Sequence, residues 1–172
     1  MNDAGGAGAD RVRIERAIRS GDVDALEAES RKTATFPRGM ADAFEHWITV
    51  AAGIGTVESI EWMIAKGASP DVCDPTGYTP LHSAIENETP DKYAIIRCLI
   101  SAGCNLDAHG FNDWTPLHLA AMRDDASALT ILLDAGAKRS VRTRIDECAT
   151  AEQEARALGH LKMADLIRDY RG

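Results

Sequence analysis

The chain has 172 residues and is 45% hydrophobic, which is enough for one folded domain with a sizeable core. A formal net charge of −8 argues against nucleic-acid binding, and no apolar run is long enough to cross a membrane. The N-terminus lacks the basic and apolar regions of a signal peptide, and the four cysteines show no C-x-x-C spacing. We therefore predict a cytoplasmic protein with reduced thiols that binds neither nucleic acid nor membrane.

The first predicted feature along the chain is a tail. Residues 1–10 are rich in glycine and alanine, and we expect this composition to leave them disordered. Residues 11–172 are predicted to form a single domain. Its organisation follows from a motif that occurs twice in the sequence.

The motif is Thr79-Pro80-Leu81-His82, which recurs 36 residues later (115 − 79) as Thr115-Pro116-Leu117-His118. An apolar segment follows each copy and ends at Gly103 or Gly136, where a left-handed helix cap is expected. Each copy predicts a turn, a short helix, a second turn and a longer apolar helix. Self-similarity at this period predicts a stack of units that bury their apolar faces against one another.

These segments resemble the ankyrin repeat, whose T-P-L-H-x-A and L-L-x-x-G-A signatures both occur twice here, in order and at matching positions. The resemblance implies an all-α solenoid of stacked helix-turn-helix repeats with short β-turn or hairpin connections. Aligning the rest of the chain to it predicts an N-terminal cap at about 11–34, units at 41–70, 74–107 and 110–143, and a C-terminal cap at 145–172.

Two segments depart from a regular repeat. The second unit, 74–107, carries three extra residues within Asn87 to Lys92, where Thr89 is predicted to cap a helix with Pro90 at its first position. The turn before the last unit carries a basic cluster, Lys138 to Arg144. We interpret this cluster as a solvated loop, with an anion or acidic-partner site as the alternative.

The sequence predicts no catalytic residue, metal or cofactor. His82 and His118 occupy the same position of the repeat, and the resemblance implies that each bonds to backbone in the neighbouring turn. Cys98 and Cys104 lack a second pair at zinc-ligand spacing, so we expect both to be small buried hydrophobes.

In the ankyrin family, partners bind at the turn tips and along the first helices. At the matching positions, aromatic, methionine and arginine side chains, types enriched at binding hot spots, gather in the third unit. The predicted partner-binding residues are Tyr78, Glu86, Phe111, Asn112, Trp114, Met122 and Arg123. The alternative is that Phe111 and Trp114 fold onto the adjacent repeat. The same positions of the last unit hold Asp146, Glu147, Ala149, Ala157 and Leu158.

We therefore expect a monomeric, non-catalytic protein-interaction module. Acidic residues beside the groove suggest a partner with basic character, namely Asp42, Glu45, Glu86, Asp146 and Glu147. One alternative is a bacterial immunity-type or accessory regulator that neutralises or assists a specific protein. A small metal-dependent enzyme built on the stack is a further alternative.

Overall fold

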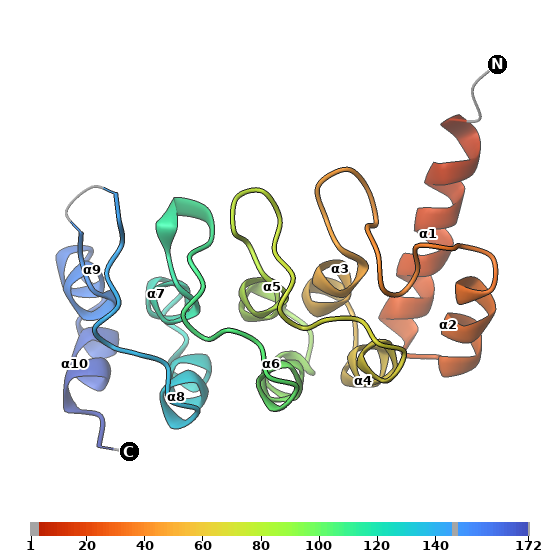
Figure 1. Cartoon of the computed structure of the whole chain (residues 1–172). Helices are drawn as coiled ribbons and strands as arrows, with labels where there is room; N and C mark the ends of the chain where they lie inside the picture. Colours follow the sequence, from red (N-terminus) through yellow and green to blue (C-terminus); the bar gives the residue numbers. More distant parts are fainter. Residues whose placement is uncertain (1–3, 146–147, 172) are drawn as a thin grey trace.

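The computed structural model describes residues 4–145 and 148–171. Within them, pairs of helices stack in a single row, and hairpin loops project from one side of that row (Figure 1). The predicted all-α ankyrin-type solenoid is confirmed. The helices are α1 (Ala4–Ser20), α2 (Val23–Ser30), α3 (Trp47–Ile54), α4 (Val57–Ala65), α5 (Pro80–Glu86), α6 (Lys92–Ser101), the 3-10 turn η1 (Phe111–Asp113), α7 (Pro116–Met122), α8 (Ala126–Asp134), α9 (Ala151–Ala157) and α10 (Leu161–Asp169).

A threonine begins the first helix of each regular unit. The Thr79 hydroxyl accepts from the backbone N–H of His82, whose Nδ1 accepts in turn from the N–H of Thr79. Thr115 repeats this capping box at the start of α7, and Thr150 forms it with Gln153 at the start of α9. Each box satisfies backbone donors that a helix start otherwise leaves unpaired, so the motif fixes where the first helices begin.

Each hairpin is closed by a backbone hydrogen bond just before that threonine. Asp74 donates to the carbonyl of Tyr78 at 3.1 Å, and Gly110 donates to that of Trp114 at 2.9 Å. In the last hairpin Thr143 donates to Ala149 at 3.0 Å, so six positions separate the bonded residues instead of four. The last hairpin is therefore longer than its two predecessors.

Residue 77 must be glycine because of its backbone angle and because a side chain there would clash with the next hairpin. Gly77 has φ +84°, and a Cβ added there would lie 2.1 Å from the carbonyl oxygen of His109 in the next hairpin. A side chain at residue 77 would therefore push neighbouring tips apart. The predicted left-handed caps are confirmed as well, with φ of 88° at Gly103 and 93° at Gly136.

The core runs without interruption along the stack. Fully buried aliphatic side chains come from both helices of successive units, including Leu81, Ile95, Leu99, Leu117 and Leu129. At the N-terminal end, the Phe36 ring lies 5.5 Å from that of Trp47 and 5.6 Å from that of Trp62, which closes the long connection between α2 and α3. Stability therefore comes from contacts between neighbouring units.

Two predictions about local structure are wrong. Helix α1 begins at Ala4, so residues 4–10 are helical rather than disordered, while residues 1–3 lie outside the described part of the chain. Alanine is the strongest helix former, and extending an existing helix needs no new nucleus. Thr89 does not cap α6 either, because that helix begins at Lys92 after Asp91.

The loop before α6 is held by the preceding unit instead. The Asn87 amide donates to the carbonyl of Ala52 at 2.8 Å, and its oxygen accepts from the N–H of Thr89 at 2.6 Å. The Asp91 carboxylate accepts from the N–H of Val57, the first residue of α4, at 3.2 Å. The three-residue insertion thus ties the second unit to both helices of the unit before it.

Candidate functional site

The hairpins and the helices that follow them form one face of the stack, which we call the inner face. It comprises the loops before α3, α5, α7 and α9 and those four helices, while α4, α6, α8 and α10 form the opposite layer (Figure 1). All seven residues predicted to bind a partner lie in these loops and helices or immediately after them.

The two repeat histidines connect units and are buried, as predicted. His82 Nε2 donates to the carbonyl of Trp114 at 3.0 Å, and His118 Nε2 donates to that of Ala149 at 3.2 Å. Burial lowers the pKa of His82 to about 4 and lowers that of His118 in the same direction. Both imidazoles are therefore neutral at pH 7, with each ring nitrogen used in a structural hydrogen bond.

Tyr78, Glu86 and Arg123 form a polar cluster on the inner face. The Tyr78 hydroxyl donates to Glu86, and the Arg123 guanidinium lies 3.8 Å from the same carboxylate. The Tyr78 ring stacks on His82 with 5.2 Å between ring centroids. Burial and the Glu86 carboxylate both raise the pKa of Tyr78. The cluster bridges α5 and α7, so these side chains support one another as well as facing solvent.

The other predicted binding residues differ in how far they are exposed. Phe111 is 65% exposed in η1, and Asn112 beside it has φ +57°. Trp114 is only half exposed, packs against the core, and donates from Nε1 to Glu154 Oε1 at 2.8 Å. The structure thus supports the packing alternative for Trp114, whereas Phe111 stays exposed. Met122 is half-buried at the end of α7.

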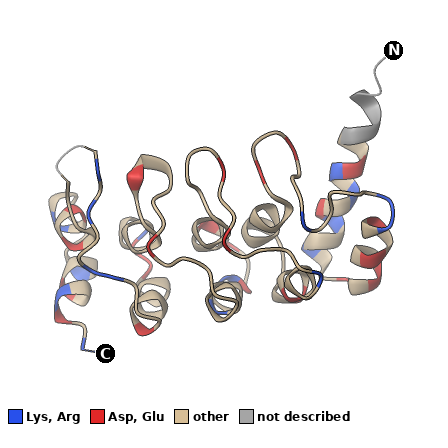
Figure 2. Cartoon of the chain, in the orientation of Figure 1, with Lys and Arg blue, Asp and Glu red and all other residues tan. Residues whose placement is uncertain are grey.

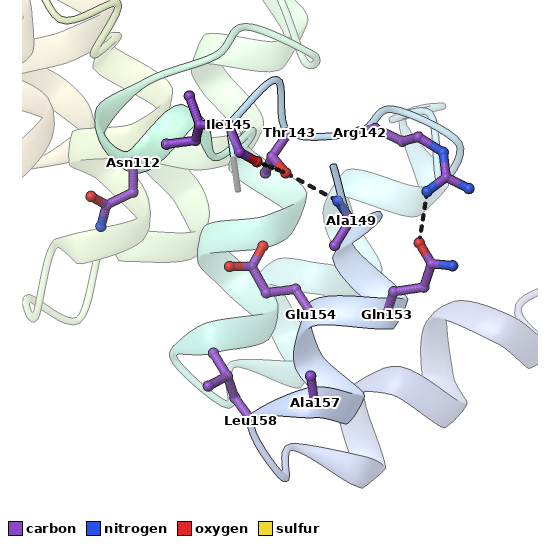
Figure 3. A pocket seen from close by; sticks show the side chains of 9 residues that line it. All are labelled: Asn112, Arg142, Thr143, Ile145, Ala149, Gln153, Glu154, Ala157 and Leu158. Carbon is purple, nitrogen blue, oxygen red and sulfur yellow. Dashed lines mark hydrogen bonds between the residues drawn. The ribbon is translucent and has the colours of Figure 1, made fainter. Parts of the chain in front are cut away.

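A pocket of about 510 Å³ opens on the inner face between the last two hairpins and α9 (Figure 3). We call it the C-terminal pocket. It is lined by Asn112, Arg142, Thr143, Ile145, Ala149, Gln153, Glu154, Ala157 and Leu158.

Sequence reasoning anticipated only part of this pocket. Asn112 was a predicted binding residue, and Ala149, Ala157 and Leu158 were placed at partner-facing positions of the last unit. Glu154 was missed, although it fills the variable position of T-P-L-H-x-A. In the second unit that position holds Ser83, whose hydroxyl donates to the carbonyl of Thr49 in the preceding unit. The repeat alignment therefore carried the signal that residue 154 faces its neighbour.

The basic cluster Lys138 to Arg144 makes contacts within the chain. Arg139 donates to the carbonyl of Ile167 at 3.0 Å near the end of α10, and Arg142 donates to that of Cys148 at 2.8 Å. Arg144 bonds the buried Asp113 and holds the pKa of that carboxyl below its usual range. The cluster therefore joins the last unit to its surroundings, which neither the solvated-loop interpretation nor the anion-site alternative described.

The acidic residues beside the groove are also partly engaged. Arg11 pairs with Asp42 at 2.5 Å and with Glu45 at 3.2 Å, and Glu86 belongs to the Tyr78 cluster. Asp146 and Glu147 lie outside the described residues. Acidic and basic residues are interspersed along the stack (Figure 2). Asp42, Glu45 and Glu86 are therefore engaged within the chain rather than free charges.

The next feature is the arrangement of the side chains that could bind a metal ion or react as thiols. Residues 4–145 and 148–171 contain no group of three or more His, Cys, Asp or Glu side chains placed to hold a metal ion. Cys104 is buried and Cys98 half-buried, and burial raises the pKa of the Cys104 thiol to about 12. Among the helices of these ranges, none is long and apolar enough to span a bilayer.

The repeat assignment is decided by comparison with known families. The pattern of three successive ankyrin repeats matches residues 48–169, which is more than half of the chain. This chain belongs to the ankyrin repeat family. Ankyrin repeats generally mediate protein–protein interaction and are generally non-catalytic, and such solenoids present extended surfaces to their partners.

Similar segments occur in much longer proteins. The chain is 30% identical over 159 residues to glycerophosphocholine phosphodiesterase gde1 of Schizosaccharomyces pombe, covering 88% of this chain and 13% of that protein. It is 34% identical over 116 residues to the putative E3 ubiquitin-protein ligase XBAT34 of Arabidopsis thaliana, covering 66% and 30%. It is 31% identical over 103 residues to the RelA-associated inhibitor of Mus musculus, covering 60% and 12%. The chain thus spans less than a third of each relative.

Proposed function

We propose that this ankyrin repeat chain is a non-catalytic module that binds a protein partner through its inner face. The observation that carries the proposal is an exposed aromatic tip beside a pocket. Phe111 stands 65% exposed next to Asn112, which lines the C-terminal pocket of about 510 Å³. A large apolar side chain exposed beside a hollow with polar edges is typical of protein recognition surfaces.

The partner-facing surface that we propose differs in emphasis from the predicted one. Phe111, Asn112, Glu86 and Arg123 remain exposed, whereas Tyr78 and Trp114 are half-buried and bonded within the chain. We assign direct contact with the partner to these four exposed residues. Tyr78 and Trp114 would hold neighbouring units in the geometry that the partner meets.

A non-catalytic role fits the chemistry of the candidate residues. His82 and His118 use both ring nitrogens in structural hydrogen bonds, which removes the strongest candidates for a general base. The relatives named as a phosphodiesterase and a ligase match this chain over 13% and 30% of their lengths. Their activities are therefore not transferred to it.

The cellular setting belongs to the same proposal. Four cysteines without a disulfide suit a reducing compartment, and we propose a cytoplasmic monomer that binds no nucleic acid, in keeping with a net charge of −8. An adaptor and an immunity-type or accessory regulator would use the same face. The identity of the captured partner would distinguish them.

Site-specific photo-crosslinking tests the proposal. A photoreactive phenylalanine analogue placed at residue 111 should crosslink a defined protein in a lysate of the source organism. The matched control places the analogue at Leu161, which is 53% exposed on α10 in the opposite layer. Capture at both positions alike, or at residue 161 alone, would contradict binding through the inner face.

A further inference from the structure

One carboxylate in the C-terminal pocket is incompletely paired. Glu154 Oε1 accepts the Trp114 Nε1–H bond at 2.8 Å, while Glu154 Oε2 is buried and has no hydrogen-bond partner among the described residues. Such an oxygen keeps its full desolvation cost until a donor reaches it. Its position on α9 places it in the wall of a pocket rather than in the sealed core.

Nearby cations of the chain are engaged elsewhere. Arg142 also lines the pocket, but its Nη1 donates to the carbonyl of Cys148 at 2.8 Å and to Gln153 Oε1 at 2.9 Å. Arg156 on the same helix pairs with Glu152 at 3.4 Å and with Asp165 at 3.0 Å. These two arginines are therefore paired with other groups, and a donor from a bound partner can pair with Glu154 Oε2.

The surroundings of Glu154 define the shape of that group. Figure 3 shows its carboxylate between Asn112 and the α9 backbone, with Ile145 and Leu158 on opposite sides of it. Leu158 is 59% exposed and Ile145 48% exposed, so both offer apolar surface at the mouth. A fitting occupant carries positive N–H donors at the end of an alkyl stem, which describes lysine and arginine side chains.

We propose that the C-terminal pocket is the subsite for a lysine or arginine side chain of the protein partner. The Glu154 carboxylate turns so that Oε2 meets the ammonium or guanidinium group, and the alkyl stem lies against Ile145 and Leu158. This inference rests on the proposed function, since it names a feature of the partner that the inner face would hold. The basic character expected of the partner would then be recognised by Glu154 rather than by the flanking carboxylates.

A displayed library of random peptides tests the subsite before the partner is identified. The full chain and its Glu154→Gln variant are each used for selection. Glutamine keeps an oxygen that can accept the Trp114 bond but removes the charge. Glu152→Gln is the matched control, because this carboxylate lies on the same helix but outside the pocket lining. Thermal melting confirms that all three proteins fold.

We expect peptides selected by the wild type and by Glu152→Gln to be enriched in lysine or arginine beside apolar residues, and those selected by Glu154→Gln to lose that enrichment. For one selected peptide, replacing its arginine by citrulline should weaken binding to the wild type about tenfold. The same replacement should change binding to Glu154→Gln less than about twofold. Leu158→Ser should also weaken binding of the original arginine-containing peptide.

Two different failures are distinguishable. Selection of peptides without basic residues, or basic enrichment that survives in Glu154→Gln, overturns the subsite while leaving inner-face binding intact. If no peptide is selected by the wild type, and Phe111 captures no protein in the crosslinking experiment, the proposed function fails and the subsite fails with it.

Discussion

At the residue scale, the fourth position of the repeated motif shows how one side chain serves two units. His82 completes the helix cap with Thr79 through Nδ1 and reaches the next hairpin through Nε2. The last unit holds Gln153 at this position, and its side-chain oxygen accepts from the N–H of Thr150 at 3.0 Å. Glutamine thus keeps the cap, and its side-chain oxygen also accepts from Arg142 at 2.9 Å.

The burial of His82 predicts a pH-dependent stability. Its pKa is about 4 in the folded chain against 6.5 for the free side chain, so the unfolded state binds more protons between these values. Well above pH 6.5 the side chain is neutral in both states, and the stability falls as the pH is lowered from 6.5 toward 4 because only the unfolded state gains the proton. At pH 5 we expect His82 to reduce the free energy of unfolding by about 2 kcal/mol relative to pH 7.5.

Urea denaturation of the wild type and of His82→Gln at these two pH values measures the effect. The variant keeps a side chain that the last unit tolerates, and it lacks this titration while His118 still titrates in both proteins. We expect a smaller loss of stability on acidification in the variant. The same loss in both proteins would show that His82 does not carry the pH dependence.

At the element scale, the helices differ in how much they contribute to the core. Leu117 on α7 is 1% exposed, whereas Leu161 on α10 is 53% exposed. Leu117→Ala should lower the free energy of unfolding by about 2–5 kcal/mol, and Leu161→Ala by less than about 1 kcal/mol. Chemical denaturation of both variants checks this contrast. Equal losses would contradict the assignment of α10 as a water-facing end of the stack.

Arg139 gives a second prediction for α10. Its guanidinium donates to the carbonyls of Ile167 and Arg168, at 3.0 and 3.3 Å, which the helix end leaves without intrahelical partners. Arg139→Ala should therefore cost about 1 kcal/mol and increase amide hydrogen exchange in α10. Lys138→Ala, at the exposed neighbour, should leave that exchange unchanged. Exchange that rises equally in both variants would argue against the capping role.

How far the sequence predicted these elements depends on the range of each interaction. The caps at Gly103 and Gly136 were predicted correctly because a helix cap depends on residues a few positions apart. Thr89 was assigned wrongly because the partner that holds its loop, Ala52, is 35 residues before Asn87. Contacts between units follow no short sequence pattern, so the helix-cap rule could not predict the bond between Asn87 and Ala52.

At the scale of the whole molecule, the fold could be predicted from a sequence pattern, whereas the candidate site depends on contacts between units. The duplicated motif was enough to predict the solenoid. The surroundings of the candidate binding residues could be described only from side-chain positions: Trp114 joins the third unit to Glu154, and the longer last hairpin borders a pocket. The resemblance to ankyrin repeats predicts which positions lie in the hairpins and first helices. Only the structure shows that Trp114 is partly buried while Phe111 is exposed.

The central claim is that a protein partner binds the inner face, and the most direct measurement is the affinity of the crosslinked partner for matched variants. Calorimetric titration would compare the wild type, Phe111→Ser and Leu161→Ser, which each replace one exposed apolar side chain on opposite sides of the stack. We expect Phe111→Ser to weaken binding about tenfold or more and Leu161→Ser to bind like the wild type. Unchanged affinity in Phe111→Ser together with weakened binding in Leu161→Ser would contradict the claim.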